Sequence, residues 1–288
     1  MASNAFSATE LQEWVPEYQS AKAQIAYEKA LVIGKQVDRS FEALLKFGDT
    51  LNIPKLANFG VADNAVTTAD LTLDVYQTLK TSIAIDQWKY KAFGVSYKEQ
   101  VQNYPEFLTA ATVKCSYSVA LAVDTYLAEL FGTATGDAGF TNTVGTEGSA
   151  LTDDVMLAAK EYLDIADVPY TDRVWDLDPE SITDLMKIDK FLRDDYVARG
   201  AVESENGLIG KSVYGGKIYL TNNLRVLNTN YHLGALMHRE AIAMIQQKAP
   251  TVDKFDWWQK FTNVVRVQCI FGAALVRADN GVRIKTRS

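Results

Sequence analysis

The sequence contains few of the residues from which metal sites and disulfide networks are built. Two cysteines, Cys115 and Cys269, and two histidines, His232 and His238, are the only ones among 288 residues. The cysteines form no CxxC pair and the histidines no HExxH spacing, so neither a disulfide framework nor a zinc site is indicated. We expect both cysteines to be buried apolar residues, and no metal or cofactor to be bound.

Motifs typical of enzymes are also missing. The chain has no GxSxG elbow and no GxGxxG loop. The segment over 207–212 ends in Gly-Lys-Ser, but position 205 holds glutamate where a phosphate-binding loop needs glycine. We interpret this segment as a β-turn before a strand.

Two other groups of neighbouring residues could suggest a functional site, but a structural role is favoured for each. The neighbouring acids Asp153-Asp154 and Asp194-Asp195 would point to different faces of a helix, so we expect solvated charges at helix ends and no acid pair. The adjacent Trp257-Trp258 lacks a basic groove beside it, and we interpret it as a packing anchor.

Long apolar runs and an excess of basic residues are absent as well. No apolar stretch approaches the roughly 20 residues that span a membrane, and the first residues, MASNAFSATELQEW, have no signal-peptide pattern. There are 29 Lys and Arg against 36 Asp and Glu, which gives a net charge of -7. Such a chain repels a phosphate backbone, so sequence-specific DNA binding is disfavoured.

Helical spacing is clearest over 105–131, where Pro105 opens the run and Gly132 follows it. Its apolar stripe predicts one long buried face. Further helices are predicted over 20–39, over 152–163, from Asp178-Pro179 onward and over 238–247. The stripe consists of Leu108, Ala111, Cys115, Val119, Ala122 and Tyr126.

Alternation of apolar and polar residues predicts strands over 47–95, at RVWDLDP, over 207–222 and in the closing segment. The segment over 133–149 is rich in glycine and threonine, which is typical of a loop or linker. The segment over 56–70 has too few large apolar residues to build a core and predicts an extended excursion. The predicted turns contain Gly48, Pro54, Gly60, Asp63-Asn64 and Gly215-Gly216.

Read in order, these segments resemble the major capsid proteins of tailed bacteriophages, whose fold is named after the Hong Kong phage type. The resemblance covers nearly the whole chain. The sequence departs from the family pattern at Trp175-Asp176, where small apolar residues are usual in the family. The segments that carry it are WVPEYQSA, GDTLNIPKL, ADLTLDVYQTLKTSIAIDQWKYKAFGVS, YPEFLTAATVKCSYSVALAVDTYLAELFG, RVWDLDPESITDLM, GLIGKSVYGGKIYLTNNL and GAALVRADNGVRIKTR.

The resemblance implies an α+β fold with an N-terminal arm, an extended β loop, a peripheral domain containing a long spine helix, and an axial domain. It places the arm and first helix at 1–40 and the extended loop at 41–95. The peripheral domain would occupy 96–148, with return strands at 256–288, and the axial domain 149–255.

The resemblance also implies a non-catalytic shell protein that assembles from pentamers and hexamers around double-stranded DNA in the virion, after synthesis in the host bacterial cytoplasm. Because the arm begins near Met1, a separate scaffolding protein is expected, together with a portal and decoration proteins. The opening aromatic segment and the excursion would be completed by neighbouring subunits. We therefore expect interface residues at Trp14, Tyr18, Phe59, Asn64, Asp70 and Asp74.

Two alternatives remain at this stage. A cellular nanocompartment shell of the encapsulin type has the same fold but packages an enzyme, and neighbouring genes would distinguish it from a phage protein. A soluble α+β enzyme would need a concave pocket with a perturbed acid–base pair, for which the sequence offers no candidate.

Overall fold

A computed structural model of the chain describes residues 31–45, 47–56, 78–98, 105–133, 136–188, 204–205, 208–227 and 231–287. Several predictions from the sequence fall outside these residues. They are the helix over 20–30, nearly all of the excursion over 56–70, and the residues Gly60, Asp63-Asn64 and Asp194-Asp195.

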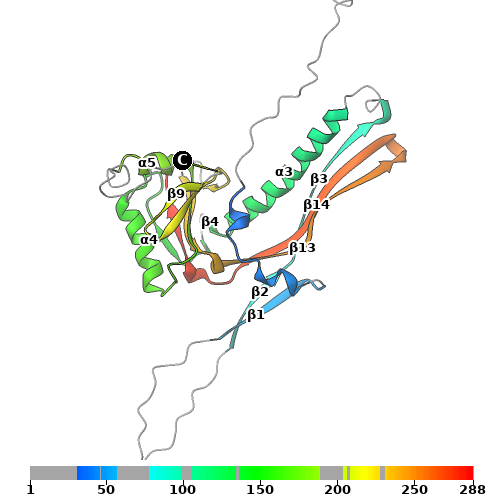
Figure 1. Ribbon diagram of the computed structural model, residues 1–288. Helices are drawn as coiled ribbons and strands as arrows, with labels where there is room; N and C mark the ends of the chain where they lie inside the picture. The colour runs from blue at the N-terminus through cyan, green and yellow to red at the C-terminus, as the bar shows by residue number, and fades with distance from the viewer. Residues whose placement is uncertain are drawn as a thin grey trace, which may run out of the picture.

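The described chain forms two bodies and a projecting ribbon (Figure 1). One body is an eight-stranded mixed sheet in the order β6-β15-β12-β7-β10-β9-β8, with β11 paired to β12. Its elements are β6 (Asn142–Val144), α4 (Asp153–Ile165), β7 (Arg173–Leu177), α5 (Pro179–Leu185), β8 (Ser204–Glu205), β9 (Leu208–Val213), β10 (Gly216–Leu220), β11 (Arg225–Leu227), β12 (Tyr231–His238) and β15 (Gly281–Lys285).

The second body is a long three-stranded antiparallel sheet in the order β13-β14-β3, with a long helix, α3, lying along it (Figure 1). The β1-β2 pair forms the projecting ribbon, and β4 and β5 form a short separate pair. These elements are β1 (Thr50–Leu56), β2 (Thr78–Ala84), β3 (Gln87–Ser96), α3 (Pro105–Glu129), β4 (Gly132–Thr133), β5 (Gly136–Gly139), β13 (Ile242–Trp257) and β14 (Thr262–Leu275). Short 3-10 turns are η1 (Ile33–Lys35), η2 (Ser40–Ala43), η3 (Arg239–Ala241), η4 (Trp258–Lys260) and η5 (Ala278–Asn280).

The long helix packs on the three-stranded sheet through its apolar stripe. Cys115 and Val119 are buried in one cluster with Val267 and Cys269 of β14. Tyr126 meets the Phe271 ring edge-on, with the ring centroids 5.5 Å apart. Buried apolar side chains of this size each contribute roughly 1.5–3 kcal/mol, so this interface holds α3 against the sheet.

The eight-stranded sheet is covered by α4 and α5. Met156 and Leu163 of α4 share a buried cluster with Trp175 of β7 and Leu236 of β12. Every residue of β7 is buried, as expected of a central strand covered on both faces. The Asp178 carboxylate accepts hydrogen bonds from the Glu180 and Ser181 amides and so caps α5.

Three stretches of chain join the bodies, and the first leads from α3 through β4 and β5 to β6. β12 lies in the eight-stranded sheet, and after η3 the chain continues as β13 in the three-stranded sheet. The return runs from β14 through η5 to β15. The expected domain boundary at residue 255 therefore falls inside β13.

The segment before the ribbon crosses the junction between the bodies. Asp38 forms a parallel bridge with Ala243, and its backbone exchanges hydrogen bonds with Ile242 (3.0 Å) and Met244 (2.9 Å). Just ahead of it, the Gly34 amide donates to the Asp124 carboxylate of α3 at 3.0 Å. The other oxygen of Asp124 accepts from the Asn223 side-chain amide at 2.9 Å. A single buried carboxylate thus connects α3, η1 and the loop after β10.

A second acid, Asp176 of β7, lies in the same buried region. It is fully buried, and neither of its oxygens has a hydrogen bond of good geometry within the described chain. Burial raises the pKa of Asp176 from 3.8 to about 8, the nearby Gln36 amide opposes the rise, and the charge of Asp124 adds to it. The carboxyl is therefore mostly protonated at neutral pH.

Within the described ranges, the ribbon is anchored at the end where Thr50 pairs with Ala84. Ile83 of β2 is fully buried with Leu45 and Ile245. Gly272 of β14 permits a close approach here, since a Cβ atom at this position would lie 2.1 Å from the Ala84 carbonyl oxygen. The strands pair from Thr50↔Ala84 outward to Leu56↔Thr78, away from the anchored end.

Several sequence predictions are confirmed. The helices beginning at Pro105, near Thr152 and at Pro179 are present, as are strands over 50–56 and 78–96 and in the closing segment. RVWDL forms β7. Both cysteines are buried.

The predicted helix over 20–39 is wrong over its described part. Residues 33–35 form a single 3-10 turn, and Asp38 pairs with β13 as a bridge. Val32, Ile33 and Val37 are all buried. Burial between the two bodies overrides the helical preference of this segment.

The predicted helix over 238–247 is also wrong, because this segment is the end of β12, η3 and the start of β13. The first four residues of β13 are all buried, so its apolar run shows neither helical nor strand periodicity. The segment over 133–149 is not simply a loop, since it contributes β5 and β6. Phe140 stacks on Phe131 with centroids 5.7 Å apart.

Three smaller predictions need correction. Pro54 lies inside β1, where it is tolerated because a two-stranded ribbon has only edge strands. The turn between β9 and β10 is centred on Tyr214 and Gly215, both with positive φ, one residue earlier than predicted. The Gly-Lys-Ser sequence lies within β9 and is followed by a strand.

The stripe on α3 also needs one correction. Cys115 and Val119 are buried as predicted, but Ala111, Ala122 and Tyr126 are only half-buried.

We predict that Val119→Asp destabilises the dissociated subunit by on the order of 3 kcal/mol or more, because it buries an unpaired charge. Thermal melting should fall by roughly 6 °C or more.

Ala122→Asp is the matched control on the same helix and should cause a much smaller loss. Equal melting temperatures for the two variants would contradict the burial of Val119 against β14.

The raised pKa of Asp176 predicts that the stability of the folded subunit depends on pH. Because its folded-state pKa lies above the unfolded value, the native state keeps its proton between about pH 4 and 8 while the unfolded chain has released it. Stability is then lost as pH rises through this range, at about 1.4 kcal/mol per pH unit. Asp176→Asn should remove this loss. The free energy of unfolding in urea is measured for both proteins from pH 5 to 7.5. The value for Asp176→Asn minus the value for the parent should increase by about 1.4 kcal/mol per pH unit.

Asp154→Asn, at an exposed position on α4, serves as the control and should run parallel to the parent. Parallel curves for Asp176→Asn and the parent would mean that Asp176 is ionised in the folded subunit.

Candidate assembly surfaces

The six predicted interface residues lie outside the described part of the chain. Trp14 and Tyr18 belong to the opening segment, and Phe59, Asn64, Asp70 and Asp74 to the segment between β1 and β2. Their role stays a prediction.

The far end of the three-stranded sheet carries a cluster of exposed aromatic side chains that we call the aromatic tip. It surrounds the turn between β13 and β14, at the end away from the eight-stranded sheet (Figure 1). Trp258 is 72% and Phe261 69% exposed. The interpretation of Trp257-Trp258 as a packing anchor is therefore wrong within this chain. The tip comprises Tyr97, Phe255, Trp257, Trp258 and Phe261.

Local contacts hold the aromatic tip in a fixed shape. The Tyr97 amide donates to the Phe261 carbonyl at 3.0 Å, and their rings meet edge-on at 6.3 Å. The Tyr97 hydroxyl donates to Asp256, which raises the pKa of Tyr97. The Lys260 ammonium lies 4.3 Å from the centre of the Trp257 ring. Phe261 adopts the left-handed conformation that closes the turn. Exposed aromatic groups fixed in this way are typical of binding surfaces.

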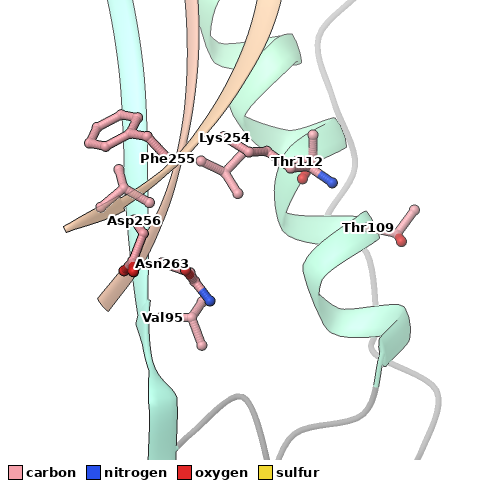
Figure 2. Close-up of a pocket in the computed structure, with 9 residues that line it drawn as sticks. Val95, Thr109, Thr112, Lys254, Phe255, Asp256 and Asn263 are labelled. Atoms are coloured by element: carbon pink, nitrogen blue, oxygen red, sulfur yellow. The ribbon is translucent and has the colours of Figure 1, made fainter. Parts of the chain in front are cut away.

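A cavity of about 360 Å³ opens beside the tip, between α3 and the sheet (Figure 2). Thr109 and Thr112 of α3 line it, together with Lys254 of β13 and Asn263 of β14. Its acid, Asp256, already accepts from Tyr97. The lining offers hydrogen-bonding groups and apolar area but no acid–base pair.

Two further groups with shifted pKa values have structural partners. Burial, followed by the hydrogen bond to Asp153 of α4, raises the pKa of Tyr214 in the turn between β9 and β10. Hydrogen bonds from Lys160 and Arg173 lower the pKa of Asp164. In the described ranges no cluster of histidine, cysteine, aspartate or glutamate is arranged to hold a metal ion. No described helix is long and apolar enough to cross a membrane.

Sequence reasoning recognised the Trp257-Trp258 pair but gave it a buried role. The signal that was present is the basic and polar surroundings of the pair, with Lys254, Asp256 and Lys260 nearby. Such spacing is typical of the exposed end of a hairpin. The cavity residues share no sequence signal, because three strands and a helix bring them together only in the fold.

Comparison with known proteins gives consistent results. A family model described as phage capsid protein matches residues 76–284. A search of curated proteins found no match. A structure from Mycobacterium phage Che8 is 23% identical, with a TM-score of 0.77 and coverage of 98% of both chains. The capsid structure of cyanophage P-SCSP1u is 15% identical, with a TM-score of 0.75 and coverage of 99% of this chain and 96% of that one.

A structure from Gordonia phage Cozz, 13% identical with a TM-score of 0.71, covers 100% of this chain and 97% of its own. At these identities the structures establish the fold, which is the α+β fold of phage capsids that the sequence suggested. The family match extends over well over half of the chain. With the two bodies, the long helix and the projecting ribbon, it shows that the chain belongs to the phage capsid protein family and is a major capsid shell protein.

Proposed function

We propose that the protein self-assembles from pentamers and hexamers into an icosahedral head shell that encloses double-stranded DNA and that it catalyses no reaction. The observation that carries this proposal is the β1-β2 ribbon. A two-stranded sheet is marginally stable by itself in water, yet this one pairs over seven residues per strand and, among the residues that the structure describes, is anchored at one end only. A neighbouring subunit supplies the missing support.

The two bodies correspond in this proposal to the domains of the family. The three-stranded sheet and α3 form the peripheral domain, and the eight-stranded sheet with α4 and α5 forms the axial domain. We place the division within the 239–241 turn, where the chain changes sheets. The ribbon belongs to the extended loop, and the aromatic tip lies at the outer end of the peripheral domain.

The proposed partners follow from shell assembly. A separate scaffolding protein guides assembly, a portal occupies one vertex, and decoration proteins bind the outer surface. The net charge of -7 supports containment of DNA without sequence-specific binding. The protein is made in the host bacterial cytoplasm and ends in the virion. The interface includes the six residues from the opening segment and the extended loop.

The extended loop provides the direct test of this function. Replacing residues 57–70 by a tight turn leaves β1 complete, because β1 ends at Leu56. Thermal melting of the dissociated subunit should be unchanged, since a surface loop contributes little to the core. Electron microscopy, with scaffolding protein supplied, should show closed shells for the parent and none for the variant.

Two results would count against this proposal. Normal shells from the variant would show that the loop is not part of the interface between subunits. A parent protein that remains monomeric at high concentration would contradict shell formation itself.

The aromatic tip gives a second test. Burying the Trp258 side chain against a partner contributes about 2 kcal/mol, so Trp258→Ser should lower the yield of shells at limiting subunit concentration by more than about tenfold. The dissociated subunit should melt within a degree of the parent, because Trp258 is exposed. Sedimentation measures the yield. Ile165→Ser removes a side chain of the same 72% exposure from the end of α4 and is the control. Equal yields for the two variants would exclude the tip as a contact.

A further inference from the structure

A second cavity, of about 320 Å³, lies where the N-terminal segment meets the eight-stranded sheet. We call it the cationic pocket. Lys35 reaches it from η1, Lys217 from β10 and Arg239 from η3. These three elements are far apart in sequence, so the fold concentrates positive charge here in a chain that is acidic as a whole.

The three side chains are available for a ligand. Lys35, Lys217 and Arg239 are exposed, and within the described residues none forms an ion pair. Arg173, which also lines the pocket, is engaged by Asp164 at 2.7 Å and by the Pro169 carbonyl at 2.9 Å. The lining contains one acid, exposed at position 172, so positive charge predominates.

The wall of the pocket also contains a buried amide. Gln36 is only 6% exposed and lines the pocket, and its side-chain amide lies near the buried Asp176 carboxyl, whose ionised form it favours. The three exposed cations therefore point to an anionic ligand.

We propose that the cationic pocket receives an acidic side chain of a neighbouring copy of this chain. The proposal rests on assembly into a shell, which brings copies into contact. Each copy carries 36 acidic residues, so carboxylates are abundant on any neighbour. DNA fits the pocket less well, because backbone binding uses a row of cations along the duplex, whereas these three converge on one concave site.

Acylation of lysine amines, read by mass spectrometry, tests this in the parent protein. Lys35 and Lys217 should react in dissociated subunits and be protected at least tenfold in shells assembled without DNA. The exposed Lys91 of β3 is the comparison within the same samples. Protection that appears only in DNA-filled particles would assign the pocket to phosphate and overturn the proposal. Equal reactivity in subunits and shells would also overturn it while leaving shell formation intact.

A carbodiimide crosslink identifies the acid directly, because it joins a lysine amine to a carboxylate in contact with it. In shells mixed from light and heavy-isotope subunits, Lys217 should be joined to aspartate or glutamate of the other isotope. Crosslinks within one subunit alone would contradict a neighbouring copy as the source.

Charge reversal completes the test. Lys217→Glu should lower the yield of shells at least tenfold, whereas Lys217→Arg keeps the charge and should retain the yield. Lys91→Glu, the same charge change on β3, should have little effect. Equal yields from Lys217→Glu and Lys91→Glu would overturn the proposal, and the acylation result decides independently if Lys217→Glu fails to fold.

Discussion

The buried carboxylate of Asp124 is the interaction on which the arrangement of the two bodies depends. It projects from the long helix and accepts hydrogen bonds from the Gly34 amide and the Asn223 side chain. Those two groups belong to the N-terminal segment and to the loop after β10. A charged acceptor buried between them fixes both at once, because loss of either partner would leave a costly unsatisfied group.

This junction explains how one chain builds two sheets that act together. The strands on both sides of η3 lie in different sheets, and the segment around Asp38 bridges to β13 just beyond that turn. The two bodies are therefore connected at the junction by main-chain hydrogen bonds as well as by side-chain packing.

The surfaces left exposed have different chemistry at each end. The aromatic tip presents Trp258 and Phe261 at one end of the long sheet, while the cationic pocket presents Lys217 and Arg239 beside the other sheet. Apolar contacts contribute most of the association energy, and charge complementarity selects the partner and its orientation. A shell subunit needs both, because each copy must bind several neighbours in one geometry.

The sequence by itself determined the local elements with strong signals, such as the helix from Pro105 to near Gly132 and the alternating strands, and the order of segments identified the family. It misassigned residues 31–39 and 238–247, because their apolar side chains are buried by contacts with distant parts of the chain, which local periodicity does not report. Only the tertiary structure decided the junction at Asp124, the exposure of Trp258 and the cationic pocket. The junction and the pocket depend on residues distant in sequence that converge in space, and local patterns carry no information about such pairs.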